Sequence, residues 1–280
     1  MIQFKGRKLV IATMHKKEDV IAPLLEAALG VKCIAGNTIN TDQFGTFSGE
    51  IERTQTPIEA AISKCTAAMK LYNCDIAVAS EGSFGPHPSL VFVPADEEWL
   101  VFIDKTNGLK IVVRHISTNT NFTGKEIKTT TELLDFANKV GFPSHGIILK
   151  NKAIENKRII KDFKDPESLI KAYHELNKDG AVVCAETDMR AMNNPTRMNV
   201  IAEATTKLID KIQSTCPVCY FPGFSITDAV KGLPCSLCNA PTRSVKAYIY
   251  ECEHCNYKKE DKYPNKITAE NPMYCNYCNP

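Results

Sequence analysis

The sequence predicts an α/β protein: a three-layer domain with a mixed sheet over residues 1–214, followed by a small double zinc-ribbon-like domain over residues 215–280. Two observations predict this division. Short apolar runs alternate with amphipathic segments through the first part, which is typical of strands and helices packed in layers. Eight of the twelve cysteines fall in the last 65 of 280 residues, in a segment too small to bury much core.

The apolar runs predict strands at 8–13, 75–79, 146–149 and 181–185. Three further runs at 89–94, 99–104 and 109–117 are close enough together to predict an antiparallel meander. Residues of helical spacing predict helices at 17–29, from Pro57 to about residue 69, at 130–140, from Pro166 to before Gly180, and at 198–212.

The clearest motif is Cys-x-x-Cys, which occurs four times in the last part of the chain. The cysteines are Cys216, Cys219, Cys235, Cys238, Cys252, Cys255, Cys275 and Cys278. A gap of two residues lets both thiolates of a Cys-x-x-Cys segment, here called a knuckle, face one ion. Two knuckles together supply the four ligands of a tetrahedral zinc site. Since the N-terminus does not resemble a secretory signal, metal binding is favoured over disulfides, and eight cysteines predict two structural zinc ions.

The pairing of the four knuckles is open on sequence alone, because sequential, nested and interleaved combinations all satisfy the spacing. We favour Cys235/Cys238 with Cys252/Cys255, because residues 244–250 resemble a ribbon strand between them. That choice leaves Cys216/Cys219 with Cys275/Cys278. A structural zinc site has only protein ligands, so no catalysis is expected here.

Polar segments at 13–17, 40–50, 80–88 and 186–197 are the candidates for chemistry. Several directly follow predicted strands, and open α/β sheets bind ligands beyond the carboxyl ends of their strands. Carboxylates suit Mg²⁺, and cationic side chains suit phosphate. The expected metal-binding or proton-transferring residues are Glu81, Glu186, Asp188 and His87. The expected substrate-binding residues are Thr13, His15, Lys16, Ser48, Ser83, Arg190, Asn194 and Arg197.

Each candidate also has a structural interpretation. The segment 80–88 can be a tight turn, and the two histidines can be hydrogen-bonded loop residues. Arg190 and Arg197 can be held in ion pairs with neighbouring acids.

Charge and composition limit the partners. Lys and Arg number 34 against 32 Asp and Glu, so no global charge predicts binding to nucleic acid. No apolar stretch is long enough for a membrane span, and we expect a cytoplasmic protein. Lysines and tyrosines are interleaved at 246–263, as in proteins that bind single strands.

Two resemblances follow from longer motifs. The segments IATMHKKED, TDQFGTFSGEIERT, ASEGSFGPHP, ETDMRAMNNPTRM and CNYCNP resemble an uncharacterised bacterial family of unknown function over nearly the whole chain. The first 115 or so residues are also similar to the inosine/xanthosine triphosphate pyrophosphatases. That likeness rests on residues 11–13 followed by Lys16 or Lys17, on residues 60–64 ending in Lys64, and on Glu81-Gly82. It implies Mg²⁺-dependent cleavage of a nucleoside triphosphate into monophosphate and pyrophosphate.

The sequence therefore leads to two functional hypotheses. The first is a Mg²⁺-dependent hydrolase or transferase acting on a phosphorylated substrate, with a nucleotide as one candidate. The second is a zinc-ribbon module that binds nucleic acid or protein, carried on a ligand-sensing α/β scaffold without catalysis.

Overall fold

The computed structural model describes residues 2–36, 55–151 and 158–280. The chain divides into two compact units. The large unit is Phe4–Leu208, and the small unit consists of Ile209–Pro280 together with residues 2–3.

A five-stranded sheet is the centre of the large unit. Its order is β2 (Lys32–Ala35), β1 (Lys8–Ala12), β3 (Ile76–Pro86), β4 (Pro94–Asp104) and β5 (Leu109–Ser117). The first three strands are parallel, and β4 and β5 continue as an antiparallel meander. The predicted mixed sheet is confirmed.

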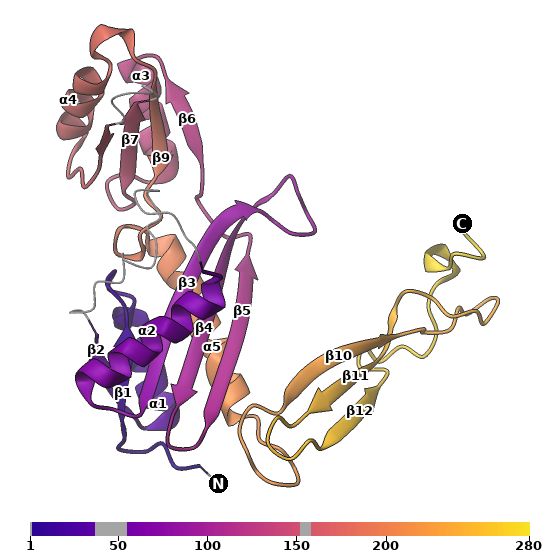
Figure 1. The fold of residues 1–280 in the computed structure, drawn as a ribbon. Helices are drawn as coiled ribbons and strands as arrows, with labels where there is room; N and C mark the ends of the chain where they lie inside the picture. Colours follow the sequence, from indigo (N-terminus) through magenta and orange to yellow (C-terminus); the bar gives the residue numbers. More distant parts are fainter. Residues whose placement is uncertain (1, 37–54, 152–157) are drawn as a thin grey trace. The chain divides into compact units, whose positions relative to one another are not determined.

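Helices cover both faces of this sheet (Figure 1). Helix α2 (Pro57–Tyr72) packs Ala61, Cys65 and Ala68 against small buried residues of β1 and β3 on one face. Its first turn is closed by a capping box between Thr56 and Glu59. Helix α5 (Pro195–Gln213) lies behind the other face, and α1 (Glu18–Leu29) contacts β1 and β2. This arrangement gives three layers.

A second, four-stranded antiparallel sheet was not expected from the sequence. Its order is β6 (Gly124–Ile127), β9 (Val183–Thr187), β7 (Ile147–Asn151) and β8 (Ile159–Ile160). Helices α3 (Thr130–Val140) and α4 (Pro166–Leu176) bury their apolar faces against it and form a separate core. The strands predicted at 75–79 and 181–185 therefore belong to different sheets.

The β3–β4 hairpin also differs from the prediction. Strand β3 continues through the polar segment expected as a loop, and the run 89–94 expected as a strand is mostly the hairpin turn. The apolar residues Leu90, Val91 and Phe92 project from the turn, with Phe92 97% exposed. Apolar character alone misled here, because the ladder from Ile76↔Asp104 to Pro86↔Pro94 places these residues beyond the last strand pair.

A buried ion pair joins α5 to β4 of the five-stranded sheet. Arg197 of α5 donates from Nε to Glu98 Oε1 of β4 at 2.7 Å, and both side chains are 0% exposed. The guanidinium also donates to the Met189 carbonyl and lies over the ring of Phe84 at 5.0 Å. Farther along the helix, His115 Nε2 and Glu203 Oε2 are 2.8 Å apart.

The small unit is built on a three-stranded antiparallel sheet. Its order is β10 (Ser225–Lys231), β11 (Val245–Glu251) and β12 (Lys258–Lys262). Short loops before, between and after these strands carry the cysteine pairs.

None of the helices in the described ranges is long and apolar enough to cross a membrane.

Gly82 of β3 makes the approach of Arg197 possible. A Cβ at this position would lie 2.5 Å from Glu98 Oε1 and would also overlap the Arg197 guanidinium. We predict that Gly82→Ala lowers the free energy of unfolding by about 1–3 kcal/mol, because the ion pair must shift. Chemical denaturation checks this prediction.

Gly85→Ala is the matched control, since it lies on the same strand and a Cβ there meets nothing within 4 Å. It should leave stability unchanged or raise it slightly. Equal losses in the two variants would mean that close approach at Gly82 is not limiting.

Candidate metal centres and a buried charged cluster

Eight cysteines form two groups of four in the small unit. The first group is Cys216, Cys219, Cys252 and Cys255, and the second is Cys235, Cys238, Cys275 and Cys278. Within each group the sulfur atoms lie within 4.8 Å of one another. The sulfurs of Cys216 and Cys255 are 3.7 Å apart, and those of Cys238 and Cys275 are 3.6 Å apart.

Each group fits a tetrahedral metal ion. A zinc–sulfur bond of about 2.3 Å implies sulfur–sulfur distances of about 3.8 Å, close to those found. Backbone N–H groups of Cys238 and Leu237 hydrogen-bond the Cys235 sulfur and lower the pKa of that thiol to about 7. Thiolates are the form that binds metal. The two clusters could therefore hold metal ions such as zinc.

The local backbone explains why the sulfurs of a knuckle converge. In the first three knuckles the residue after the second cysteine has positive φ, as in Tyr220, Asn239 and Asn256. Its N–H donates to the carbonyl of the first cysteine, for example Tyr220 N to Cys216 O at 2.9 Å. The chain thus folds back on itself, and both side chains point to one side.

The pairing of the knuckles is interleaved, so the pairing favoured from the sequence is wrong. Cys216/Cys219 pairs with Cys252/Cys255, and Cys235/Cys238 pairs with Cys275/Cys278. The pairing follows from the antiparallel directions of β10, β11 and β12, which connect the knuckles. One strand separates each knuckle from the next, so successive knuckles lie at opposite ends of the sheet. The seven residues of β11 span about 23 Å, too far for Cys238 and Cys252 to share an ion.

A second cluster consists of charged side chains buried in the large unit, where β1 ends. Lys17 Nζ donates to Ser80 Oγ at 2.8 Å and to the Ser80 carbonyl at 3.3 Å. On the same side of the sheet, β4 presents Asp96 and Glu98, both 0% exposed. The cluster is therefore Lys17, Ser80, Asp96, Glu98 and Arg197.

Several buried carboxylate oxygens in this cluster have no hydrogen-bond partner among the described residues: both oxygens of Asp96 and Oε2 of Glu98. Burial and the neighbouring Glu98 raise the pKa of Asp96 to about 8. Burial lowers the pKa of Lys17 to about 8. A buried carboxylate without partners is unfavourable, so this site favours a proton or a cation at Asp96.

Glu81 lies next to this cluster in sequence but on the α2 side of β3. It forms an ion pair with Lys64 of α2, and both side chains are at most about a tenth exposed. Thr13, Lys17, Lys64 and Glu81, which carry the pyrophosphatase resemblance, thus all lie near the carboxyl end of β1 or the middle of β3.

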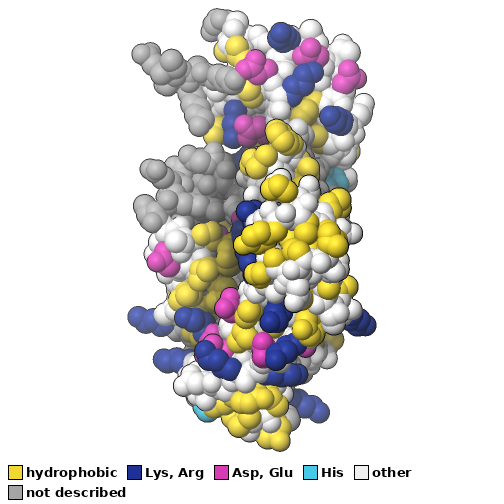
Figure 2. All heavy atoms as spheres, turned by 90° about the vertical axis from the view of Figure 1, so that its right-hand side faces the viewer, with side chains coloured by type: hydrophobic (Ala, Val, Ile, Leu, Met, Phe, Trp, Pro, Cys, Tyr) yellow, Lys and Arg dark blue, Asp and Glu magenta, His cyan; other side chains and the backbone are white. Residues whose placement is uncertain are grey.

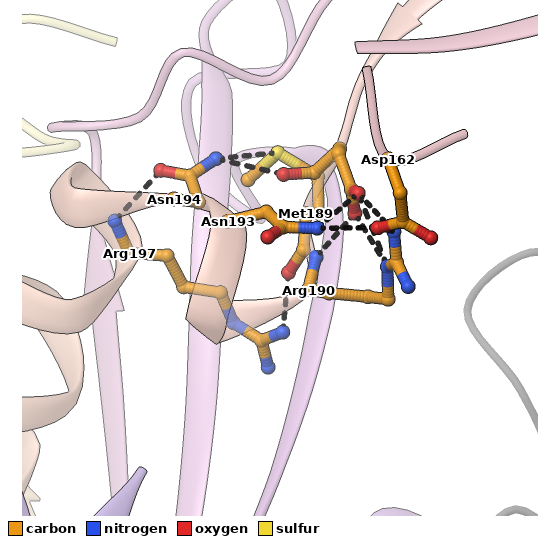
Figure 3. A network of polar contacts seen from close by, with 7 residues as sticks. Asp162, Met189, Arg190, Asn193, Asn194 and Arg197 are labelled. Atoms are coloured by element: carbon orange, nitrogen blue, oxygen red, sulfur yellow. Dashed lines mark hydrogen bonds and ion pairs between the residues drawn. The ribbon is translucent and has the colours of Figure 1, made fainter. Parts of the chain in front are cut away.

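The segment 186–197 forms a polar network of its own (Figure 3). Arg190 binds Asp188 through Nε and Nη2, and Nη2 also lies 2.6 Å from Asp162 Oδ1. Burial would raise the pKa of Asp188, but hydrogen bonds from Arg190 and Asn193 outweigh it and lower that pKa. Asn194 Oδ1 accepts from Arg197 N at 3.0 Å and caps α5.

The remaining predicted residues are dispersed. Glu186 binds Lys150 of β7 at 2.6 Å, and Ser83 donates to Glu97 at 3.3 Å. His87 accepts from two amides of the hairpin turn, Ser89 N and Leu90 N. His15 and Lys16 lie in the loop after β1, and Ser48 falls outside the described residues. The structure therefore joins Asp188, Arg190 and Asn194 in one network and places Glu81 in another.

Sequence reasoning missed Asp96 and Glu98 altogether. A signal was present, because both acids alternate with Leu100 and Phe102 on one face of the strand Pro94–Asp104. Acids at the buried positions of a strand are unusual and mark a polar site.

The fold and the cysteine groups together define a class: an α/β unit with a small unit containing two four-cysteine clusters. The sequence model of a family described as "Domain of unknown function (DUF6671)" matches residues 64–280, more than half of the chain. The chain belongs to this family. No curated protein matches it.

Metal content of double variants tests the pairing. Cys216→Ser/Cys252→Ser removes ligands from one cluster, so one metal ion per chain should remain. Cys216→Ser/Cys275→Ser damages both clusters and should leave none. Native mass spectrometry measures both. The reverse result would restore the pairing favoured from the sequence.

The buried Asp96 predicts a pH dependence of stability. Its folded pKa of about 8 lies above the usual 3.8, so the folded chain keeps a proton that the unfolded chain loses in this window. The stabilising contribution is full at pH values below about 4 and is lost as pH rises toward 8. Between about pH 5 and pH 7, the unfolding free energy should fall by about 2.5 kcal/mol more in the native chain than in Asp96→Asn, because each pH unit contributes about 1.4 kcal/mol per proton.

Urea denaturation at both pH values makes this measurement, with Asp135→Asn as control because Asp135 is exposed on α3. That control should retain the native pH dependence. An Asp96→Asn variant with an unchanged pH dependence would mean that Asp96 is ionised in the folded chain.

Proposed function

We propose that the large unit is a Mg²⁺-dependent hydrolase or transferase acting on a phosphorylated substrate, with its active site at the carboxyl end of β1. One observation carries the proposal: a buried lysine, Lys17, faces a pair of buried acids, Asp96 and Glu98, and three of their four oxygens lack hydrogen-bond partners among the described residues. Cations for phosphate and carboxylates for a metal are the two requirements of phosphoryl chemistry.

The position of the cluster supports a ligand site. Strands β2, β1 and β3 are parallel, and ligands of such sheets bind beyond the carboxyl ends of the strands. The loop that follows β1 leads from buried Thr13 through exposed Met14 and Lys16 to buried Lys17. A substrate would therefore reach the cluster along this loop.

The acids suit a magnesium ion. Asp96 and Glu98 offer three oxygens without partners in the described part of the chain, and Mg²⁺ prefers oxygen ligands. In the described residues, only the two cysteine groups bring three or more ligand side chains together, so water and phosphate oxygens would complete the shell. When bound, the ion would neutralise charge on the phosphate.

The roles of the chain's own residues follow from their contacts. Lys17, held by Ser80, would bind a phosphate oxygen. Glu81, held by Lys64 on the other face of β3, would act through its charge, which partly offsets the lowering of the Lys17 pKa by burial, and would not take a proton from a water in the cluster. Asp188 and Arg190 bind each other, which favours a structural role and leaves them out of the proposed site. The resemblance to inosine/xanthosine triphosphate pyrophosphatases makes a nucleoside triphosphate the first substrate to test.

The proposal predicts that Lys17→Met and Asp96→Asn each reduce Mg²⁺-dependent release of pyrophosphate or phosphate by about 100-fold or more. The assay uses purified native chain, a panel of nucleoside triphosphates and phosphate monoesters, and Mg²⁺. Lys70→Met, an exposed lysine of α2, is the control and should retain activity. Thermal unfolding of each variant separates loss of chemistry from loss of fold.

Two results would count against the proposal. Release that continues in Asp96→Asn would remove the acids from the reaction. Absence of release across the panel, together with unchanged Mg²⁺ affinity in Asp96→Asn, would make the cluster a structural feature and favour the alternative of a binding module without catalysis.

A further inference from the structure

Exposed apolar side chains gather around the second cysteine cluster of the small unit. They are Leu237, Met273, Tyr274 and Tyr277, which we call the apolar tip. Leu237 and Tyr277 occupy the same place in their knuckles, the residue before the second cysteine, and each is 75% exposed. Figure 2 faces this end of the small unit and shows hydrophobic side chains gathered on it.

The apolar tip is held in place by backbone and side-chain contacts. Glu270 N donates to Pro234 O at 2.8 Å, and Ser236 N donates to Glu270 O at 2.9 Å, joining the two knuckle segments. Asn271 Oδ1 accepts from Met273 N, and Asn279 Nδ2 donates to Met273 O, both at 2.9 Å. Two exposed tyrosines are thus presented on an ordered surface, which reduces the entropy cost of binding.

The charge around this tip differs from that at the other end of the sheet. Segments 231–246 and 262–280, which surround the tip, contain five Lys or Arg and one acid. Segments 216–224 and 251–261, around the first cluster, contain two Lys and four acids. A divalent ion with four thiolates adds equal charge to each end, so the difference persists.

The cations near the tip are available to a ligand. Lys231, Arg243 and Lys266 are exposed, and none has an ion pair with any described residue. Strand pairing brings Lys231 and Lys262 to the same end of the sheet, because they lie beside Val245 and Ala247 at the start of β11. Aromatic surfaces flanked by exposed cations match the bases and phosphates of a single strand.

We infer that the apolar tip binds single-stranded nucleic acid, with bases stacked on Tyr274 and Tyr277 and phosphates held by the surrounding Lys and Arg. This function is independent of the chemistry proposed for the large unit. Stacking does not distinguish bases strongly, so binding should show little sequence preference. Duplexes should bind more weakly, because their bases are not free to stack.

Fluorescence anisotropy with a labelled single strand of about 16 nucleotides tests the inference on the full metal-loaded chain. Tyr277→Ala and Tyr274→Ala should each weaken the Kd by about 5- to 100-fold, and Tyr277→Phe should restore binding because the ring remains. Arg243→Ala and Lys266→Ala should each lower the slope of log K against log salt by about 0.7.

Tyr220→Ala is the matched control, because Tyr220 is an exposed tyrosine beside the first cluster. It should leave the Kd unchanged. Metal content and circular dichroism of every variant establish that the clusters remain intact.

Several outcomes would overturn the inference. Absence of binding by the native chain at low salt would do so, as would an affinity that does not change with salt. Equal losses in Tyr220→Ala and Tyr277→Ala would remove the tip from the interface. A dimer in sedimentation velocity that Leu237→Ser dissociates would assign the tip to a second copy of the chain instead.

Discussion

The buried pair of Arg197 and Glu98 is the interaction on which the large unit depends. It joins α5 to β4, and the same guanidinium binds the Met189 carbonyl in the segment that follows the second sheet. One side chain therefore ties two sheets and a helix together. Two charges removed from water are stable only with such close partners, and removing one of them typically costs about 3–5 kcal/mol. Gly82 is the residue whose lack of a side chain leaves room for the pair.

The spacing of apolar residues and the positions of Gly and Pro predicted most of the helices and strands. Tertiary geometry explains the elements that they did not predict. Gly30 ends α1 in the left-handed conformation and Pro57 begins α2, as expected. The short strands β6 and β8 lack a recognisable pattern, so the second sheet was missed and the segment 186–197 was assigned to the wrong sheet edge. Arg197 was expected to meet phosphate, whereas its contacts with Glu98 and Met189 depend on tertiary structure. The acids at 96 and 98 could have been found from strand alternation, but the lack of partners at three of their four oxygens among the described residues could not.

The cysteine ligands were identifiable from spacing because the chemistry is local, since each knuckle forms within a few residues. Their pairing was not, because it depends on the direction of strands between knuckles. If one strand is assumed between successive knuckles, the interleaved pairing follows. Antiparallel strands return the chain to the same end of the sheet at every second knuckle. Both β10 and β12, the strands that complete this count, are rich in exposed polar residues and carry no strong apolar signal.

The interleaved pairing of the cysteine clusters makes the small unit indivisible along the chain. The loop closed by Cys216 and Cys255 overlaps the loop closed by Cys235 and Cys278, and the shared stretch contains all of β11. No cut in the chain yields two separate modules that each keep a complete set of ligands. Excising the segment that carries one cluster would also remove ligands of the other, whereas substituting single cysteines affects one cluster at a time. The lengths of its strands are constrained in the same way, because they set where each knuckle emerges.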